Sequence, residues 1–149
     1  MVDQDLRAID PLPHRPIHSL IIPIPMVCFL GTLATDLPYW GTAEMMWADA
    51  SAWLLAVGLL FGLFAAIAMV IDALGRRLST MRGPVWLYSI SNALILVLSF
   101  FNALVHSRDA WTSVVPTGLI LSCVVVVLVL FSGWIRQALI YRRGPGVER

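Results

Sequence analysis

The chain contains no lysine and few charged residues of any kind. Its ten basic residues are all arginine, charged residues make up 13% of the 149 positions, and the formal net charge is +1. Soluble domains carry about 25% charged residues, so this composition argues against a soluble globular protein. A net charge so close to zero also provides no basic field for nucleic acid. We therefore expect no nucleic-acid partner.

Cysteine is scarce, and the usual signs of catalysis are missing. Cys28 and Cys123 lie within apolar stretches and form no C-x-x-C pair. This excludes a zinc motif and a disulfide framework, and both cysteines are expected to pack as small apolar side chains. The sequence also lacks a glycine-rich phosphate loop, paired carboxylates and a nucleophile beside a base. We expect no catalytic residues and no metal site, and a chain without enzymatic activity is the favoured interpretation.

Long apolar runs fill most of the chain instead. Hydrophobic residues make up 59% of it, and the mean hydropathy is +0.84. A helix rises about 1.5 Å per residue, so about 20 apolar residues cross a hydrocarbon core of about 30 Å. The sequence predicts an all-α integral membrane protein, an antiparallel four-helix bundle. The predicted spans are residues 19–35, 53–72, 85–106 and 116–135.

Arginine placement predicts how the bundle is oriented. With four spans, nine of the ten arginines lie on one side, and Arg108 lies on the other. Because positive residues concentrate in the cytoplasm, both termini are predicted there. Residues 1–16 then form a polar cytoplasmic segment, 17–141 the four-helix transmembrane domain, and 142–149 a short basic cytoplasmic tail. An outer loop is expected over residues 36–51.

Small residues and prolines suggest how the helices pack. Gly58, Gly62 and Ala66 are spaced four apart in the second span, which lets another helix approach closely. Packing within the bundle is the favoured interpretation, and a dimer or partner interface is the alternative. Pro23 and Pro25 are expected to make the first helix irregular near the inner face.

Polar residues recur along the third span at helical spacing. They are separated by 4, 7, 3 and 4 residues, which keeps them on one stripe of the helix. Polar groups facing lipid would be unsatisfied, so the stripe must face the bundle. Hydrogen bonds between helices are the favoured role; a lining for a quinone headgroup, a haem edge or a proton path is the alternative. The stripe consists of Tyr88, Asn92, Ser99, Asn102 and His106.

Ionisable residues lie near the ends of the spans. Asp36 ends the first span on the outer side, where it is expected to cap the loop or bind an arginine such as Arg108. His18 lies near the inner end of the first span, and His106 near the outer end of the third. These two histidines are about a bilayer apart, so they cannot ligate one haem together.

Several short motifs resemble a small bacterial family of membrane proteins, catalogued as domain of unknown function 2231. The opening motif Arg-Pro-Ile-His-Ser-Leu-Ile-Ile-Pro-Ile-Pro begins at Arg15. Similar stretches are Ile-Asp ending at Asp72, the region from Tyr88 to Asn92, and the ending from Ser132 to Val147. The resemblance implies a compact four-helix membrane domain in the bacterial inner membrane, with no established general activity. It places His18, Asp72 and Asn92 at motif positions.

The same resemblance implies a b-type haem held by two inner-face histidines. This chain departs from that pattern, because Arg15 and Tyr88 stand where the family commonly has histidine, and His18 alone is kept. Tyrosine can serve as an unusual iron ligand. His18, Tyr88 and Asn92 are therefore the candidate cofactor-binding residues, for haem or quinone.

Two functional classes follow. The first is a non-catalytic membrane subunit that packs in a larger respiratory or photosynthetic electron-transfer complex, with lipids and other membrane subunits as partners. The alternative is a redox membrane module that binds b-type haem or quinone. A bound lipid or pigment is also compatible with the long aliphatic faces.

Overall fold

The computed structural model describes residues 18–75, 84–107 and 114–141, and these are helical almost throughout. The elements in chain order are α1 (His18–Ile21), α2 (Pro23–Thr42), α3 (Met45–Gly75), α4 (Pro84–His106), η2 (Val114–Gly118) and α5 (Leu119–Tyr141). No strand occurs in these three ranges. The all-α membrane bundle predicted from the sequence is confirmed.

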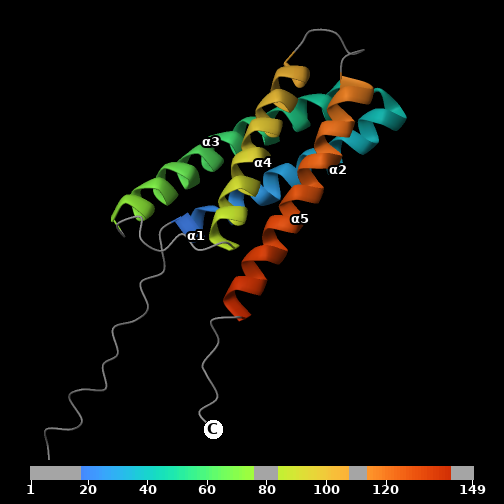
Figure 1. The fold of residues 1–149 in the computed structure, drawn as a ribbon. Helices are drawn as coiled ribbons and strands as arrows, with labels where there is room; N and C mark the ends of the chain where they lie inside the picture. The colour runs from blue at the N-terminus through green and yellow to red at the C-terminus, as the bar shows by residue number, and fades with distance from the viewer. Residues whose placement is uncertain (1–17, 76–83, 108–113, 142–149) are drawn as a thin grey trace, which may run out of the picture.

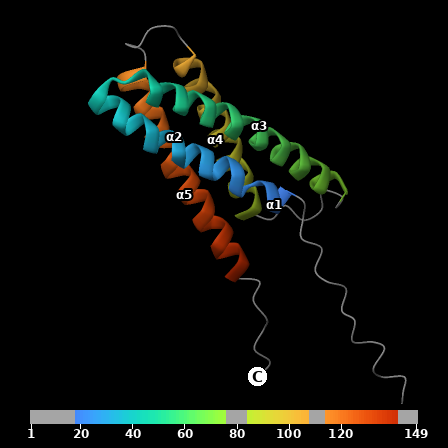
Figure 2. The ribbon, with the colours of Figure 1, turned by 180° about the vertical axis from the view of Figure 1, so that it is seen from behind.

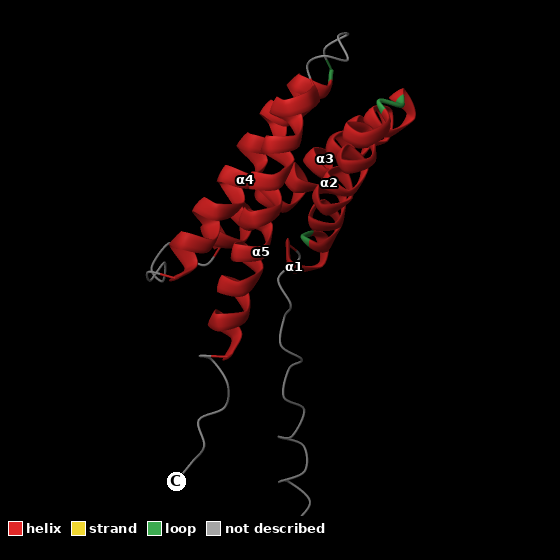
Figure 3. Cartoon of the chain, turned by 90° about the vertical axis from the view of Figure 1, so that its right-hand side faces the viewer, coloured by secondary structure: helices red, strands yellow, loops and turns green. Residues whose placement is uncertain are grey.

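The four long helices form an antiparallel bundle in which each packs against two neighbours. α2 packs most extensively against α3, and α4 against α5; contacts of α3 with α4 and of α2 with α5 close the ring. Figure 3 shows these two helix pairs side by side, and Figure 2 shows α2 and α3 from behind. The start of α1 and the end of α5 lie at one end, which we call the terminal end (Figure 1). At the opposite end, the hairpin end, α2 turns into α3.

The first helix is interrupted where the sequence predicts it. Ile22 separates α1 from α2, which begins at Pro23. Proline has no N–H to donate and clashes with the preceding turn, so a helix restarts there more easily than it continues. The predicted irregularity is confirmed.

The loop expected over residues 36–51 is wrong. α2 continues to Thr42, with Pro38 inside it, and α3 begins at Met45. Ala43, in the left-handed conformation with φ 54°, ends α2 and donates its N–H to the carbonyl of Tyr39. The expected loop begins at Asp36, but the Asp36 carboxylate has partners inside the bundle, and the helix continues past it.

Three stretches of the described residues are long and apolar enough to cross a membrane: Met45–Ile71, Trp86–His106 and Val114–Ala138. The first predicted span corresponds to α1 and most of α2 and is not among them. Thr32, Thr35 and Asp36 make this segment more polar than the others. α2 nevertheless packs along α3 as the fourth member of the bundle, and its passage through the bilayer stays a prediction, as does the orientation of the termini.

The interior is built of layers to which each long helix contributes. The middle layer is apolar and consists of Phe29 of α2, Leu55 of α3, Ile95 of α4, and Val125 and Val129 of α5. A second apolar cluster toward the terminal end contains Ile22, Ala65, Tyr88 and Ile135. On the hairpin side of the middle layer the buried residues are mostly polar. This alternation separates two regions with different chemistry.

The small-residue ridge on α3 serves packing within the bundle. A methyl group at Gly58 would lie 2.7 Å from the ring of Phe29 on α2. At Gly62 it would collide with Leu96 of α4. The favoured interpretation of this ridge is confirmed, because both glycines are covered by other helices of the same chain.

The outside of the bundle is apolar, with tryptophans toward both ends. Trp40 and Trp53 are exposed in the half of the bundle nearer the hairpin end, and Trp86 and Trp134 in the half nearer the terminal end. Amphipathic indole rings favour the two bilayer interfaces, so this distribution suits a membrane-spanning bundle.

Candidate functional site

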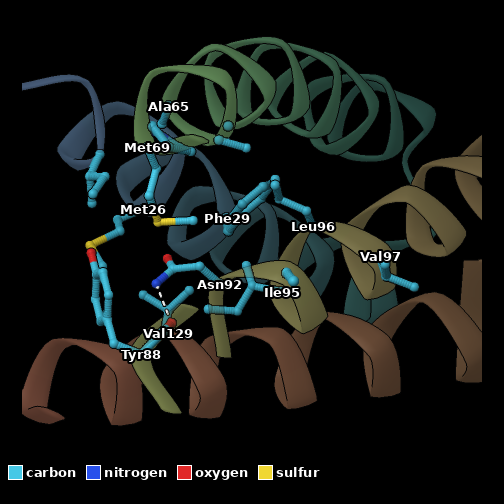
Figure 4. Close-up of a pocket in the computed structure, with 15 residues that line it drawn as sticks. Met26, Phe29, Ala65, Met69, Tyr88, Asn92, Ile95, Leu96, Val97 and Val129 are labelled. Atoms are coloured by element: carbon cyan, nitrogen blue, oxygen red, sulfur yellow. Dashed lines mark hydrogen bonds between the residues drawn. The ribbon is translucent and has the colours of Figure 1, made fainter. Parts of the chain in front are cut away.

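A cavity of about 290 Å³ lies between the helices in the terminal half of the bundle. Residues of α2, α3, α4 and α5 line it, and Figure 4 shows their side chains. Ala93 and Val97 of α4 belong to the lining and are exposed on the surface, so the cavity reaches the outside of the bundle. In a membrane, that opening faces lipid. The lining is mostly aliphatic, with the thioethers of Met26 and Met69.

Two of the three predicted cofactor-binding residues meet in this cavity. Tyr88 and Asn92 both line it, one turn apart on α4. The Asn92 amide nitrogen donates to the Tyr88 carbonyl oxygen (2.8 Å) and to the Ser132 hydroxyl of α5 (3.2 Å). These bonds fix the amide, and Figure 4 shows its oxygen on the side of Met69. The amide therefore presents a hydrogen-bond acceptor to the space between the helices.

The hydroxyl of Tyr88 is the unusual group here. It is buried and makes no hydrogen bond of normal geometry with a described residue, although it interacts weakly with the side chain of Asn92. Figure 4 shows the hydroxyl end of the ring directed toward Met26, which packs against the same cluster. A buried hydroxyl normally finds a partner, since leaving it unpaired costs about 1–3 kcal/mol. The Tyr88 hydroxyl thus offers a donor to a bound molecule.

His18, the third predicted site residue, begins α1 at the terminal end of the bundle. Its side chain lies outside the described residues, as do those of Asp72 and Arg15. A joint site of His18 with Tyr88 therefore stays a prediction.

A second buried site lies on the other side of the apolar middle layer. Asp36 of α2 is at its centre, and its side chain is 1% exposed. Its Oδ1 accepts from the Ser51 hydroxyl of α3 (2.6 Å) and lies 3.0 Å from Nε2 of His106 on α4. Its Oδ2 accepts from the Ser122 hydroxyl of α5 (2.5 Å). All four long helices thus meet at one carboxylate.

Further bonds hold the partners of Asp36 in place. Nδ2 of the Asn102 side chain donates to the Ser122 hydroxyl (2.8 Å). The main-chain carbonyl oxygen of Asn102 lies 2.9 Å from Nδ1 of His106. Gly118 permits this approach, because a methyl group there would lie 2.9 Å from Cε1 of His106. We call Asp36, Ser51, Asn102, His106 and Ser122 the polar cluster.

The polar cluster is not arranged as a hydrolytic triad. Both serine hydroxyls donate to the carboxylate, and both imidazole nitrogens are occupied by Asp36 and the Asn102 carbonyl. A triad requires the serine to be hydrogen-bonded to the imidazole. No group of three or more His, Cys, Asp or Glu side chains suited to a metal occurs in the described part of the chain.

Residues 14–149 match the model of a protein family described as a predicted membrane protein, DUF2231. The chain belongs to DUF2231. No curated protein and no solved structure matches it. Membership of DUF2231 agrees with the helical membrane bundle and confirms the resemblance drawn from the short motifs.

The sequence predicts the polar stripe on α4 of this DUF2231 member, but it does not predict the contact of that stripe with Asp36. Tyr88, Ser99 and Asn102 are buried and face other helices, as predicted. The link from His106 to Asp36 was missed, because the two residues are 70 positions apart and Asp36 was assigned to a loop. A signal was present: both were expected at the outer end of the bundle, and a buried carboxylate needs a partner of opposite charge.

Proposed function

We propose that this protein binds a lipophilic molecule with an oxygen-bearing ring, of the quinone class, in the cavity at Tyr88. It does so as a non-catalytic subunit of a larger electron-transfer assembly in the bacterial inner membrane. The observation on which the proposal rests is the buried Tyr88 hydroxyl, which makes no hydrogen bond of normal geometry with a described residue and borders a cavity open to the lipid side.

The cavity favours a quinone ring over haem. Its volume of about 290 Å³ lies just below the usual range for small-molecule sites, about 300–1,000 Å³. This suits a single substituted ring whose isoprenoid tail extends into lipid between the exposed side chains. A quinone carbonyl would accept a hydrogen bond from the Tyr88 hydroxyl, and a quinol hydroxyl could donate to the Asn92 amide oxygen. Haem would need an axial ligand from Tyr88 or His18.

The role as a subunit is supported by the chemistry of the chain. The hydroxyls, imidazole and carboxylate of the polar cluster are all used in contacts between helices, so the described residues offer no nucleophile beside a free base. A protein that binds a redox carrier without reactive groups of its own acts by holding the carrier near the centres of a partner.

The test is quinone binding by the purified protein. Lipid extracts of protein purified in mild detergent are analysed for quinones, and a short-chain quinone is titrated into the delipidated protein. Replacing Tyr88→Phe removes the hydroxyl and keeps the ring, so affinity should fall by roughly threefold to tenfold, the value of one hydrogen bond of about 0.5–1.5 kcal/mol. Tyr39→Phe is the matched control, because Tyr39 is buried near the hairpin end.

Four outcomes would contradict the proposal. Equal quinone affinity in the Tyr88→Phe variant and wild type would remove the assigned donor. A Soret band with stoichiometric haem would favour the haem module. A co-purified lipid or pigment that short-chain quinone cannot displace would assign the cavity to that molecule. A native mass of one 16.5 kDa chain in mild detergent would argue against the larger assembly.

A further inference from the structure

The pair formed by Asp36 and His106 is sealed inside the bundle. Each side chain is 1% exposed, and Nε2 of His106 lies 3.0 Å from Oδ1 of Asp36. A buried charge is costly unless it is paired and hydrogen-bonded. The charge of this pair therefore bears directly on the stability of the bundle.

Hydrogen-bond geometry fixes most of the protons in the cluster. The main-chain carbonyl oxygen of Asn102 can only accept a hydrogen bond. Nδ1 of His106, which lies 2.9 Å away, must therefore carry a hydrogen. The Ser122 oxygen accepts from the Asn102 amide, which leaves its own hydrogen for Oδ2 of Asp36. Ser51 donates to Oδ1. Asp36 thus receives two hydroxyl donors, an environment that stabilises its carboxylate form.

One proton remains to be placed, between Nε2 of His106 and Oδ1 of Asp36. We infer that Asp36 and His106 form a proton-binding site, in which His106 is an imidazolium that neutralises the Asp36 carboxylate and thereby holds all four helices together. Without that proton, a lone pair on Nε2 faces a carboxylate oxygen at 3.0 Å, and the cluster has a buried net negative charge. Loss of the proton and opening of the hairpin end are then coupled.

Among the described residues, no other group at this end replaces the proton. The described ionisable residues nearby are Tyr39, which is buried on α2, and Glu44 and Asp49, which are exposed. None of the three side chains is cationic, so none can balance the charge of Asp36. α3 and α5 place Ser51 and Ser122 against the pair, and serine hydroxyls have no pKa near neutral pH.

The stability of the bundle should depend on pH in both directions. Stability contributed by the pair is present while His106 is protonated and is lost as pH rises and the imidazolium gives up its proton. It is also lost at pH low enough to protonate Asp36. The site is separate from the quinone cavity, since the apolar middle layer lies between them.

The decisive measurement is ¹⁵N NMR of the imidazole in detergent. With His14→Gln and His18→Gln, His106 is the single histidine of the chain, which has three. At neutral pH both ring nitrogens should give the signals of protonated nitrogens. Raising the pH should remove the Nε2 proton and lower the thermal midpoint over the same interval. A bare Nε2 signal at neutral pH in the folded protein would overturn the inference.

A variant pair provides the second measurement. Asp36→Asn should abolish the loss of thermal stability between neutral and alkaline pH, because no buried charge then depends on His106. Asp49→Asn, at an exposed acid on the same end, should keep the wild-type profile. A wild-type midpoint that does not change with alkaline pH would also overturn the inference, and this measurement needs no variant to fold. Quinone binding plays no part in either readout, so the two proposals can fail independently.

Discussion

Asp36 of α2 and His106 of α4 lie 70 positions apart in the chain and meet at 3.0 Å inside the bundle. Their bond connects the first helix hairpin to the second. Ser122 of α5 and Ser51 of α3 complete the contact, so one carboxylate joins four helices. In a medium that offers no competing water, such an arrangement substitutes for hydrophobic attraction between helices, which is weak in lipid.

Replacing Ser122→Ala should destabilise the bundle strongly. The hydroxyl both accepts from Asn102 and donates to Asp36, so its removal leaves two buried groups without that partner. The expected loss is about 1–3 kcal/mol in the free energy of unfolding. Denaturant titration in detergent, followed by tryptophan fluorescence, measures it. Ser107→Ala is the control, because among the described residues this exposed hydroxyl bonds only to the Leu104 carbonyl. The change in free energy of unfolding should be within about 0.5 kcal/mol of zero.

Two glycines should respond oppositely to alanine. Gly62→Ala places a methyl group against Leu96 and should cost about 1–3 kcal/mol through overpacking. A methyl group at Gly133 on α5 meets no atom within 4 Å, so Gly133→Ala should be neutral or stabilise by up to about 1 kcal/mol through helix propensity. Thermal midpoints in the same detergent compare the two variants. Equal midpoints would mean that α3 and α4 do not pack as described.

Asn92→Leu should destabilise the bundle by roughly 1 kcal/mol, since it removes a hydrogen bond between helices. That bond joins Asn92 to Ser132 at 3.2 Å. A double-mutant cycle with Ser132→Ala isolates the contribution of the pair from other effects of each change. A coupling energy indistinguishable from zero would show that Asn92 contributes through its bond to the Tyr88 carbonyl alone.

Topology can be tested by cysteine labelling, with Cys28 and Cys123 first replaced. A cysteine introduced at Gly146, in the predicted cytoplasmic tail, should resist an impermeant thiol reagent added to intact cells and react after lysis. Labelling from the periplasmic side would refute the predicted orientation. A cysteine at Glu44, exposed between α2 and α3, should show the opposite pattern.

Filling the cavity should weaken the proposed quinone binding without unfolding the protein. Ala66 lines the cavity, and Ala66→Leu extends an aliphatic side chain into it. Short-chain quinone should then bind at least about tenfold more weakly, as expected when a ring loses its space, a cost of about 1.4 kcal/mol or more. Ala56→Leu, at an exposed position of α3 outside the lining, is the control. Unchanged affinity in Ala66→Leu would move the ligand elsewhere.

The sequence predicts the helices better than it predicts their contacts. The runs of aliphatic residues predict the class of fold. The spacing of polar residues from Tyr88 to His106 predicts which face of α4 points inward. The end of the first span could not be read from composition, because a carboxylate such as Asp36 looks like a loop residue until its partners are known. Those partners come from three other helices, and single-chain periodicity has no information on how helices are rotated against each other.

The cavity could not be predicted from the sequence either. Tyr88 and Asn92 were chosen by their place in the stripe, and they do border one space. The space itself also depends on Gly62 and Ala65 of α3. In the sequence, such small residues predict close helix packing just as well as a cavity. Whether small residues produce contact or a void is decided by the side chains opposite them.

The apolar middle layer has a consequence for proton movement through the bundle. Phe29, Leu55, Ile95, Val125 and Val129 carry no side-chain group that could pass a proton, and they separate the Asp36 cluster from Tyr88 and Asn92. An ion moving through this layer would have to shed its hydration. A redox carrier in the proposed site at Tyr88 would therefore exchange protons with its own end of the bundle and not with the Asp36 cluster across this layer.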